Sequence, residues 1–199
     1  MIIGIDIDEV LAEFLEAYCN FFNEKYGTKF TWENFHSYSF WKVAGGTREE
    51  TTNDVHEFHK TKYFSKINPV EGSIEAINEL KNGNTLYAVS SRQDHLLSDT
   101  TQWLEKHYPK MFDGIYLTNH LAKSQPKKTK KEICAILKVD VLIEDQPKFA
   151  VECALENRTV ILFDKPWNKA FSAKNVTRAK NWNEIINLIK QKENNAIKV

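Results

Sequence analysis

The sequence lacks the features that mark secreted, membrane-spanning or strongly nucleic-acid-binding proteins. Cysteine is scarce: Cys19, Cys134 and Cys153 are widely spaced and form neither a CxxC pair nor a zinc-binding pattern. We interpret them as reduced core thiols of a cytoplasmic protein. No apolar run is as long as a signal-peptide core or a membrane span. Lysine plus arginine and aspartate plus glutamate each number 27, so no net charge attracts DNA or an anionic membrane.

Apolar residues, by contrast, are abundant enough for a folded core. Hydrophobic residues make up 42% of the chain and aromatic residues 12%, a composition that excludes a disordered protein. A length of 199 residues suits one domain of ordinary size with a small insertion.

Short apolar segments alternate with helical patterns along most of the chain. This alternation is typical of an α/β fold, so we predict a Rossmann-like parallel sheet with helices on both of its faces. The five predicted strands comprise residues 2–5, 85–89, 115–117, 139–143 and 159–163.

One segment does not follow this alternation. Residues 13–67 begin with a helical pattern, then become rich in aromatic residues and poor in β-branched ones. We predict a small helical cap over 13–67, inserted after the first strand. Residues 1–12 and 68–199 then form the core domain.

Polar side chains follow three of the predicted strands. In a parallel sheet these strand ends share one edge, where ligands bind. Carboxylates crowded there repel one another unless a divalent cation lies among them, and oxygen ligands favour Mg²⁺. As an alternative, the first two aspartates only cap the following helix. The residues at the three strand ends are Asp6 and Asp8, Ser90 and Ser91, and Glu144 and Asp145.

Lysines are concentrated between Lys123 and Lys131, before a predicted helix. We interpret this run as a solvated loop, because it lacks the interleaved aromatic residues that nucleic-acid stacking needs. One lysine and one hydroxyl beside the acidic strand ends would suit a bound phosphate.

The order and context of these motifs resemble those of the haloacid dehalogenase superfamily of phosphotransferases. The matching residues are Asp6, Asp8 and Val10, then Ser90, then a lysine, then Glu144 and Asp145. Residues 141–147 and 163–168 are similar to segments of the 5′(3′)-deoxyribonucleotidase branch. The resemblance implies a phosphatase fold with a cap after the first strand.

The resemblance also implies catalytic roles. Asp6 would be the nucleophile that forms an aspartyl-phosphate, and Asp8 the acid and base that serves the leaving oxygen and the hydrolytic water. Ser90 and Ser91 would bind the phosphate.

The same resemblance implies a metal site. Asp6, Asp145 and the backbone carbonyl of Asp8 would hold Mg²⁺. Glu144 stands where many members have a second aspartate, and we place it behind the metal ligands.

The spacing along the sequence indicates which lysine matches the lysine of the family pattern. Lys130 lies fourteen residues before Glu144 and fits the family pattern best. The alternatives that remain open are Lys127, Lys128 and Lys131.

Aromatic residues of the cap are candidates for holding a nucleobase. Phe14 matches an aromatic position of the nucleotidase branch, and Trp41 and Phe64 are further candidates. As an alternative, these rings only pack the cap. Gln146 departs from the arginine that follows the acidic pair in some relatives.

The expected function is therefore Mg²⁺-dependent hydrolysis of nucleoside monophosphates. Open alternatives are another small phosphomonoester, a polynucleotide 3′-phosphate, or a non-catalytic module that binds phosphate or a partner. We expect no membrane association and no stable nucleic-acid complex, and the oligomeric state stays open.

Overall fold

The computed structural model describes residues 1–119, 128–155 and 157–197. Its centre is a six-stranded sheet in the order β3-β2-β1-β4-β5-β6, with every neighbouring pair parallel. The predicted fold class is confirmed. The strands are β1 (Ile2–Ile5), β2 (Thr85–Ser90), β3 (Gly114–Leu117), β4 (Val141–Glu144), β5 (Thr159–Phe163) and β6 (Val176–Ala179).

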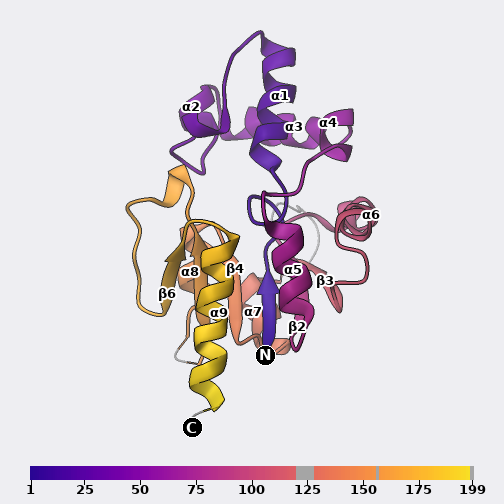
Figure 1. Ribbon diagram of the computed structural model, residues 1–199. Helices are drawn as coiled ribbons and strands as arrows, with labels where there is room; N and C mark the ends of the chain where they lie inside the picture. The colour runs from indigo at the N-terminus through magenta and orange to yellow at the C-terminus, as the bar shows by residue number, and fades with distance from the viewer. Residues whose placement is uncertain (120–127, 156, 198–199) are drawn as a thin grey trace.

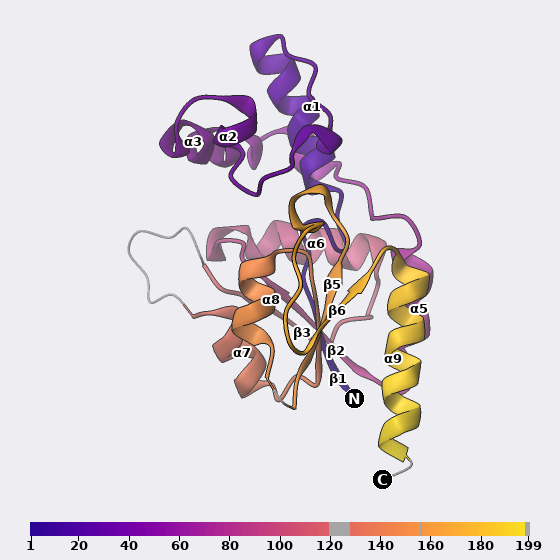
Figure 2. The ribbon, with the colours of Figure 1, turned by 90° about the vertical axis from the view of Figure 1, so that its left-hand side faces the viewer.

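The central strands are buried because helices cover both faces of the sheet. Figure 2 shows α5 (Ser73–Lys81) and α9 (Trp182–Ile197) on one face and α7 (Lys130–Ile136) and α8 (Pro147–Cys153) on the other. Apart from Glu144 at the end of β4, the residues of β1 and β4 are accordingly apolar on both sides, as is typical of buried parallel strands. A further helix, α6 (Leu97–His107), connects β2 to β3.

Strand β6 is the element that the sequence did not predict. It pairs with β5 at the edge of the sheet, and two of its four residues, Thr177 and Arg178, are polar. Arg178 forms an ion pair with Asp164, at 2.5 Å. A short edge strand that is partly solvated lacks the apolar run on which strand prediction depends.

Beyond the carboxyl ends of the strands lies the helical cap (Figure 1). It contains α1 (Phe14–Tyr26), α2 (Trp41–Ala44), α3 (Arg48–Phe58) and α4 (Lys62–Ser65), with a short 3₁₀ turn at Trp32–Asn34. Its entering and leaving segments lie side by side: Glu13 N–H donates to the Asn68 carbonyl at 2.9 Å, and Val70 N–H to the Leu11 carbonyl at 2.8 Å.

The remaining expectations concern cysteines and membranes. Cys19, Cys134 and Cys153 are buried free thiols, as predicted. Within the part of the chain that the structure describes, no helix has both the length and the apolar character needed to cross a bilayer.

Candidate active site

The loop that follows β1 is fixed by buried hydrogen bonds. Asp6 N–H still donates to the Ile143 carbonyl on β4, at 3.0 Å. Farther along, the Val10 carbonyl accepts from the indole of Trp182 and the Leu11 carbonyl from the hydroxyl of Tyr108, both at 3.1 Å. The loop therefore presents its acidic side chains on a rigid support.

Helix capping does not explain Asp6 and Asp8. Glu9, which has a left-handed φ of 67°, accepts a hydrogen bond from Leu15 N–H at 2.6 Å through its carboxylate. The other oxygen of Glu9 lies 3.2 Å from the Lys165 ammonium. Glu9 thus satisfies the start of α1, and the two aspartates are free for another role.

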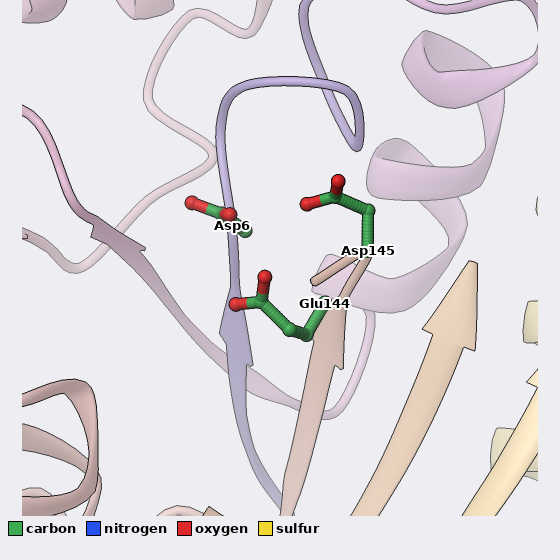
Figure 3. Close-up of side chains that lie close together, drawn as sticks. All are labelled: Asp6, Glu144 and Asp145. Carbon is green, nitrogen blue, oxygen red and sulfur yellow. The ribbon is translucent and has the colours of Figure 1, made fainter. Parts of the chain in front are cut away.

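Three buried carboxylates converge at the ends of β1 and β4 (Figure 3). Asp6, Glu144 and Asp145 each place one oxygen within 4.8 Å of the others. Their exposed fractions are 6%, 0% and 2%. The sequence predicted this convergence from strand ends alone.

Lys130 is the lysine that the structure brings to this group. Its ammonium lies 2.6 Å from Asp6 Oδ2 and 2.6 Å from Glu144 Oε2, and its side chain is fully buried. Lys128 and Lys131 are exposed. Lys123 and Lys127 lie outside the described residues.

One ammonium does not compensate three buried carboxylates. Burial, and then the charge of Glu144, raises the pKa of Asp6 to about 8 even though Lys130 acts in the opposite direction. The same two causes hold the pKa of Asp145 well above its usual range. An oxygen-only group with excess negative charge fits a hard divalent cation such as Mg²⁺.

Asp6 and Asp145 line a cavity of about 180 Å³. Ser90, at the end of β2, is 1% exposed, and its hydroxyl accepts from Arg92 N–H at 3.3 Å. The structure therefore places the predicted acidic and hydroxyl residues, with the exception of Glu144, around one space. The cavity is lined by Asp6, Asp8, Ser90, Ser91 and Asp145, among others.

Asp8 differs from the expectation of four clustered carboxylates. It forms an ion pair with Arg92, whose Nη2 lies 2.6 Å from Oδ1 and whose Nε lies 3.1 Å from Oδ2. Arg92 also donates to Thr100 Oγ1 at 3.0 Å and lies 5.0 Å from the ring centre of Phe64. The sequence did not single out Arg92, although it follows Ser90 and Ser91 directly.

The structure places one of the three aromatic candidates, Phe14, on the cavity wall. Trp41 is the first residue of α2, and the preceding Phe40 lines the cavity in its place. Phe64 lines a neighbouring cavity of about 550 Å³, since its ring packs beneath Arg92. Tyr38 and Trp167 complete the aromatic wall, and sequence reasoning did not assign either of them to it.

The buried position of Lys130 generates a stability prediction. Lys130→Met leaves Asp6 and Glu144 without their cation, so the free energy of unfolding should fall by about 3–5 kcal/mol. The exposed neighbour Lys131 provides the control, and Lys131→Met should change stability little. Urea denaturation at neutral pH measures both, and equal stability of the two variants would contradict the proposed ion pair.

Comparison with known proteins agrees with this geometry. Residues 1–194 match the model of the family described as 5′ nucleotidase, deoxy (pyrimidine), cytosolic type C protein (NT5C). A 5′(3′)-deoxyribonucleotidase of Bacillus subtilis is 26% identical over 92% of this chain and 95% of its own length. A nucleotidase of Clostridium acetobutylicum is 25% identical over 94% and 92%, respectively.

Solved structures show the same fold at lower identity. A haloacid dehalogenase-like hydrolase of Streptococcus pneumoniae superposes with a TM-score of 0.68 at 13% identity, covering 94% of this chain and 97% of its own. The magnesium-bound structure of YfnB from Bacillus subtilis gives 0.58 at 12% identity, with the same coverage. With the family match over nearly the whole chain, the predicted resemblance is confirmed. The chain belongs to the cytosolic type C family of 5′ nucleotidases, which are phosphomonoester hydrolases of the haloacid dehalogenase fold.

Proposed function

We propose that this protein hydrolyses nucleoside monophosphates with the help of Mg²⁺ and through an aspartyl-phosphate on Asp6. One observation carries the proposal: Asp6, Asp8, Ser90 and Asp145 line a cavity that is also lined by aromatic residues of the cap. Side chains suited to phosphate chemistry and flat apolar side chains therefore line the same cavity.

Asp6 is suited to the role of nucleophile. Its Oδ1 accepts from Ile7 N–H at 2.8 Å and its Oδ2 faces Lys130, so the carboxylate is held in one orientation. Attack forms the bond from a carboxylate oxygen to phosphorus and breaks the bond to the leaving oxygen. Water then attacks the same phosphorus and returns Asp6 to its free form.

Asp8 is suited to proton transfer. Its carboxylate lines the cavity, lies apart from the three clustered carboxylates and is 28% exposed. It gives a proton to the leaving oxygen and later takes one from the attacking water. Arg92 fixes its orientation through two nitrogens.

Mg²⁺ would be held by Asp6, Asp145 and the backbone carbonyl of Asp8. When bound, it neutralises the excess negative charge and that of the phosphoryl group. The magnesium bound to YfnB, a protein of the same fold, supports the choice of this ion. Both oxygens of Glu144 already accept protein donors, from Lys130 and from Gln146 N–H, so we assign Glu144 to positioning Lys130.

The cap selects the leaving group in this proposal. Residues 13–67 act as the cap, and residues 1–12 with 68–199 form the core that binds the phosphoryl group, through Ser90, Ser91 and Lys130. Phe14 provides a flat surface for a base. The relatives, a nucleotidase and a 5′(3′)-deoxyribonucleotidase, support a nucleotide substrate.

Replacing the nucleophile tests the reaction. Asp6→Asn should fold but lose phosphate release from nucleoside monophosphates by several orders of magnitude, because no neighbouring oxygen replaces the attacking one. Asp99→Asn, on the exposed side of α6, should remain active. A panel of 5′- and 3′-nucleotides, sugar phosphates and nicked DNA with a 3′-phosphate identifies the substrate. Near-native turnover by Asp6→Asn would overturn the mechanism.

Metal binding can be measured without turnover. Mg²⁺ at a hundredfold excess over its dissociation constant should stabilise the wild type by about 2.7 kcal/mol, which appears as a higher melting temperature. Asp145→Asn removes a charged ligand and should reduce this shift sharply, whereas Asp99→Asn should keep it. An equal shift in wild type and Asp145→Asn would place the metal elsewhere.

The aromatic wall predicts a substrate-specific effect. Phe14→Ala should raise the KM for nucleoside monophosphates, since lost stacking costs about 1–3 kcal/mol, and should affect acetyl phosphate far less. Phe22→Ala is the control, because Phe22 packs within the cap, 4.6 Å from Tyr26 between ring centres. If Phe14→Ala impaired both substrates equally and lowered the melting temperature, Phe14 would be a packing residue.

A further inference from the structure

Unpaired buried polar atoms gather at the cavity. Among the residues that the structure describes, four buried side-chain nitrogen or oxygen atoms have no hydrogen-bond partner. Three of them belong to residues that line the active-site cavity: His59 Nδ1, Ser91 Oγ and Gln93 Oε1. A buried polar atom without a partner is destabilising and rare, so their concentration around one cavity indicates a ligand that pairs with them.

The unpaired side-chain oxygen of Gln93 has no role in the proposed phosphate chemistry. Ser91 lies beside Ser90 and is already assigned to the phosphate. Gln93 is 5% exposed, yet its carbonyl oxygen accepts no hydrogen bond from the described residues. The preceding residue, Arg92, forms an ion pair with Asp8. Gln93 is the next residue of the same loop and lies one position farther along the chain from the acidic site.

The backbone around Gln93 is firmly held. The Arg92 carbonyl accepts from Asn119 N–H at 3.1 Å. Asp94 is bound on both sides by the same residue: its N–H donates to Asn119 Oδ1 at 3.3 Å, and its carboxylate accepts from Asn119 Nδ2 at 2.9 Å. The backbone position of Gln93 is therefore fixed between two anchored residues, which favours a recognition role over a flexible surface role.

The cavity wall has chemistry that suits a flat ring beside the phosphoryl site. Phe14 and Phe40 line it with apolar surface, and Gln93 lines it with an amide. A sugar would instead need several polar partners around its hydroxyl groups.

We propose that Gln93 is a specificity-determining residue whose carboxamide oxygen accepts a hydrogen bond from an N–H on the edge of the substrate's heterocyclic ring. This inference rests on the proposed nucleotidase function and extends it to the edge of the base. The favoured leaving groups are nucleosides whose base carries a ring N–H or an amino group at this edge.

The surroundings favour an uncharged ring. Burial lowers the pKa of His59 to about 4, so its imidazole is neutral near neutral pH. The charge of Asp8 is compensated by Arg92. A neutral base therefore meets an amide and an imidazole in this part of the cavity, and a base without the N–H would leave the oxygen of Gln93 unpaired.

Methylation of the base provides the test. The substrate is the nucleoside 5′-monophosphate that the wild type hydrolyses fastest, compared with its counterpart in which the N–H of the base is methylated. The wild type should favour the unmethylated compound by roughly 5- to 150-fold in kcat/KM, the range of one good base contact. Gln93→Leu should reduce this ratio to about twofold or less.

A matched variant controls for the substitution itself. Gln102 lies on α6, is exposed and bonds to Ser98 at 3.2 Å, so Gln102→Leu should keep the wild-type ratio. Gln93→Leu should also be at least as heat-stable as the wild type, because it removes an unpaired buried oxygen. An unchanged ratio in Gln93→Leu, or the absence of any preference in the wild type, would overturn the proposal.

A binding measurement separates this inference from the proposed function. Titration calorimetry, with a chelator present to remove metal ions, measures the binding of the free nucleoside and of its methylated counterpart. Neither compound has a phosphate. Wild type should bind the unmethylated nucleoside more tightly, and Gln93→Leu should bind both alike. If no nucleotide is hydrolysed, the nucleotidase proposal fails; if nucleotides are hydrolysed but both proteins bind the two nucleosides alike, only the role of Gln93 fails.

Discussion

The structure of the active site depends on a buried imbalance of charge. Asp6, Glu144 and Asp145 meet at the ends of two adjacent strands, and Lys130 is the ammonium placed among them. Burying such a group is costly unless its members are paired. The surrounding chain therefore supplies donors: Gln146 N–H to Glu144 at 3.0 Å, and the Trp167 indole to Asp145 at 2.9 Å. The negative charge left over is what a divalent cation would offset.

A second ion pair connects this site to the cap. Asp8 and Arg92 pair at 2.6 Å, and the guanidinium lies over Phe64 of α4. His59, at the end of α3, contacts both Phe14 and Phe64 through its ring. Asp8, to which we assign proton transfer, is thus connected to Phe14 of the cap through Arg92, Phe64 and His59.

The sequence predicted those parts of the site that follow from strand ends. Asp6, Ser90 and Asp145 come directly after apolar strands, and parallel topology brings such positions together. Spacing also favoured Lys130 over its neighbours. Of the three aromatic candidates, Phe14 is among the residues that line the cavity, whereas Trp41 and Phe64 are not, because composition shows that a cap is aromatic but not which rings face the cavity.

Other features depend on tertiary packing that no local pattern reveals. Arg92 acquires its role only because the loop after β2 lies beside Asp8. Gln93 is distinguished by an oxygen that has no partner among the described residues, a property of the folded state alone. Strand β6 lacks an apolar run and exists through its pairing with β5.

Chemical trapping of the intermediate tests the central claim most directly. The enzyme is quenched in acid during steady-state hydrolysis, and borohydride then reduces any acyl phosphate to an alcohol, which peptide mass spectrometry locates. The account predicts that the modified residue is Asp6, and that the modification is lost when substrate is omitted. Modification at Asp8 or Asp145, or none anywhere while turnover proceeds, would contradict it.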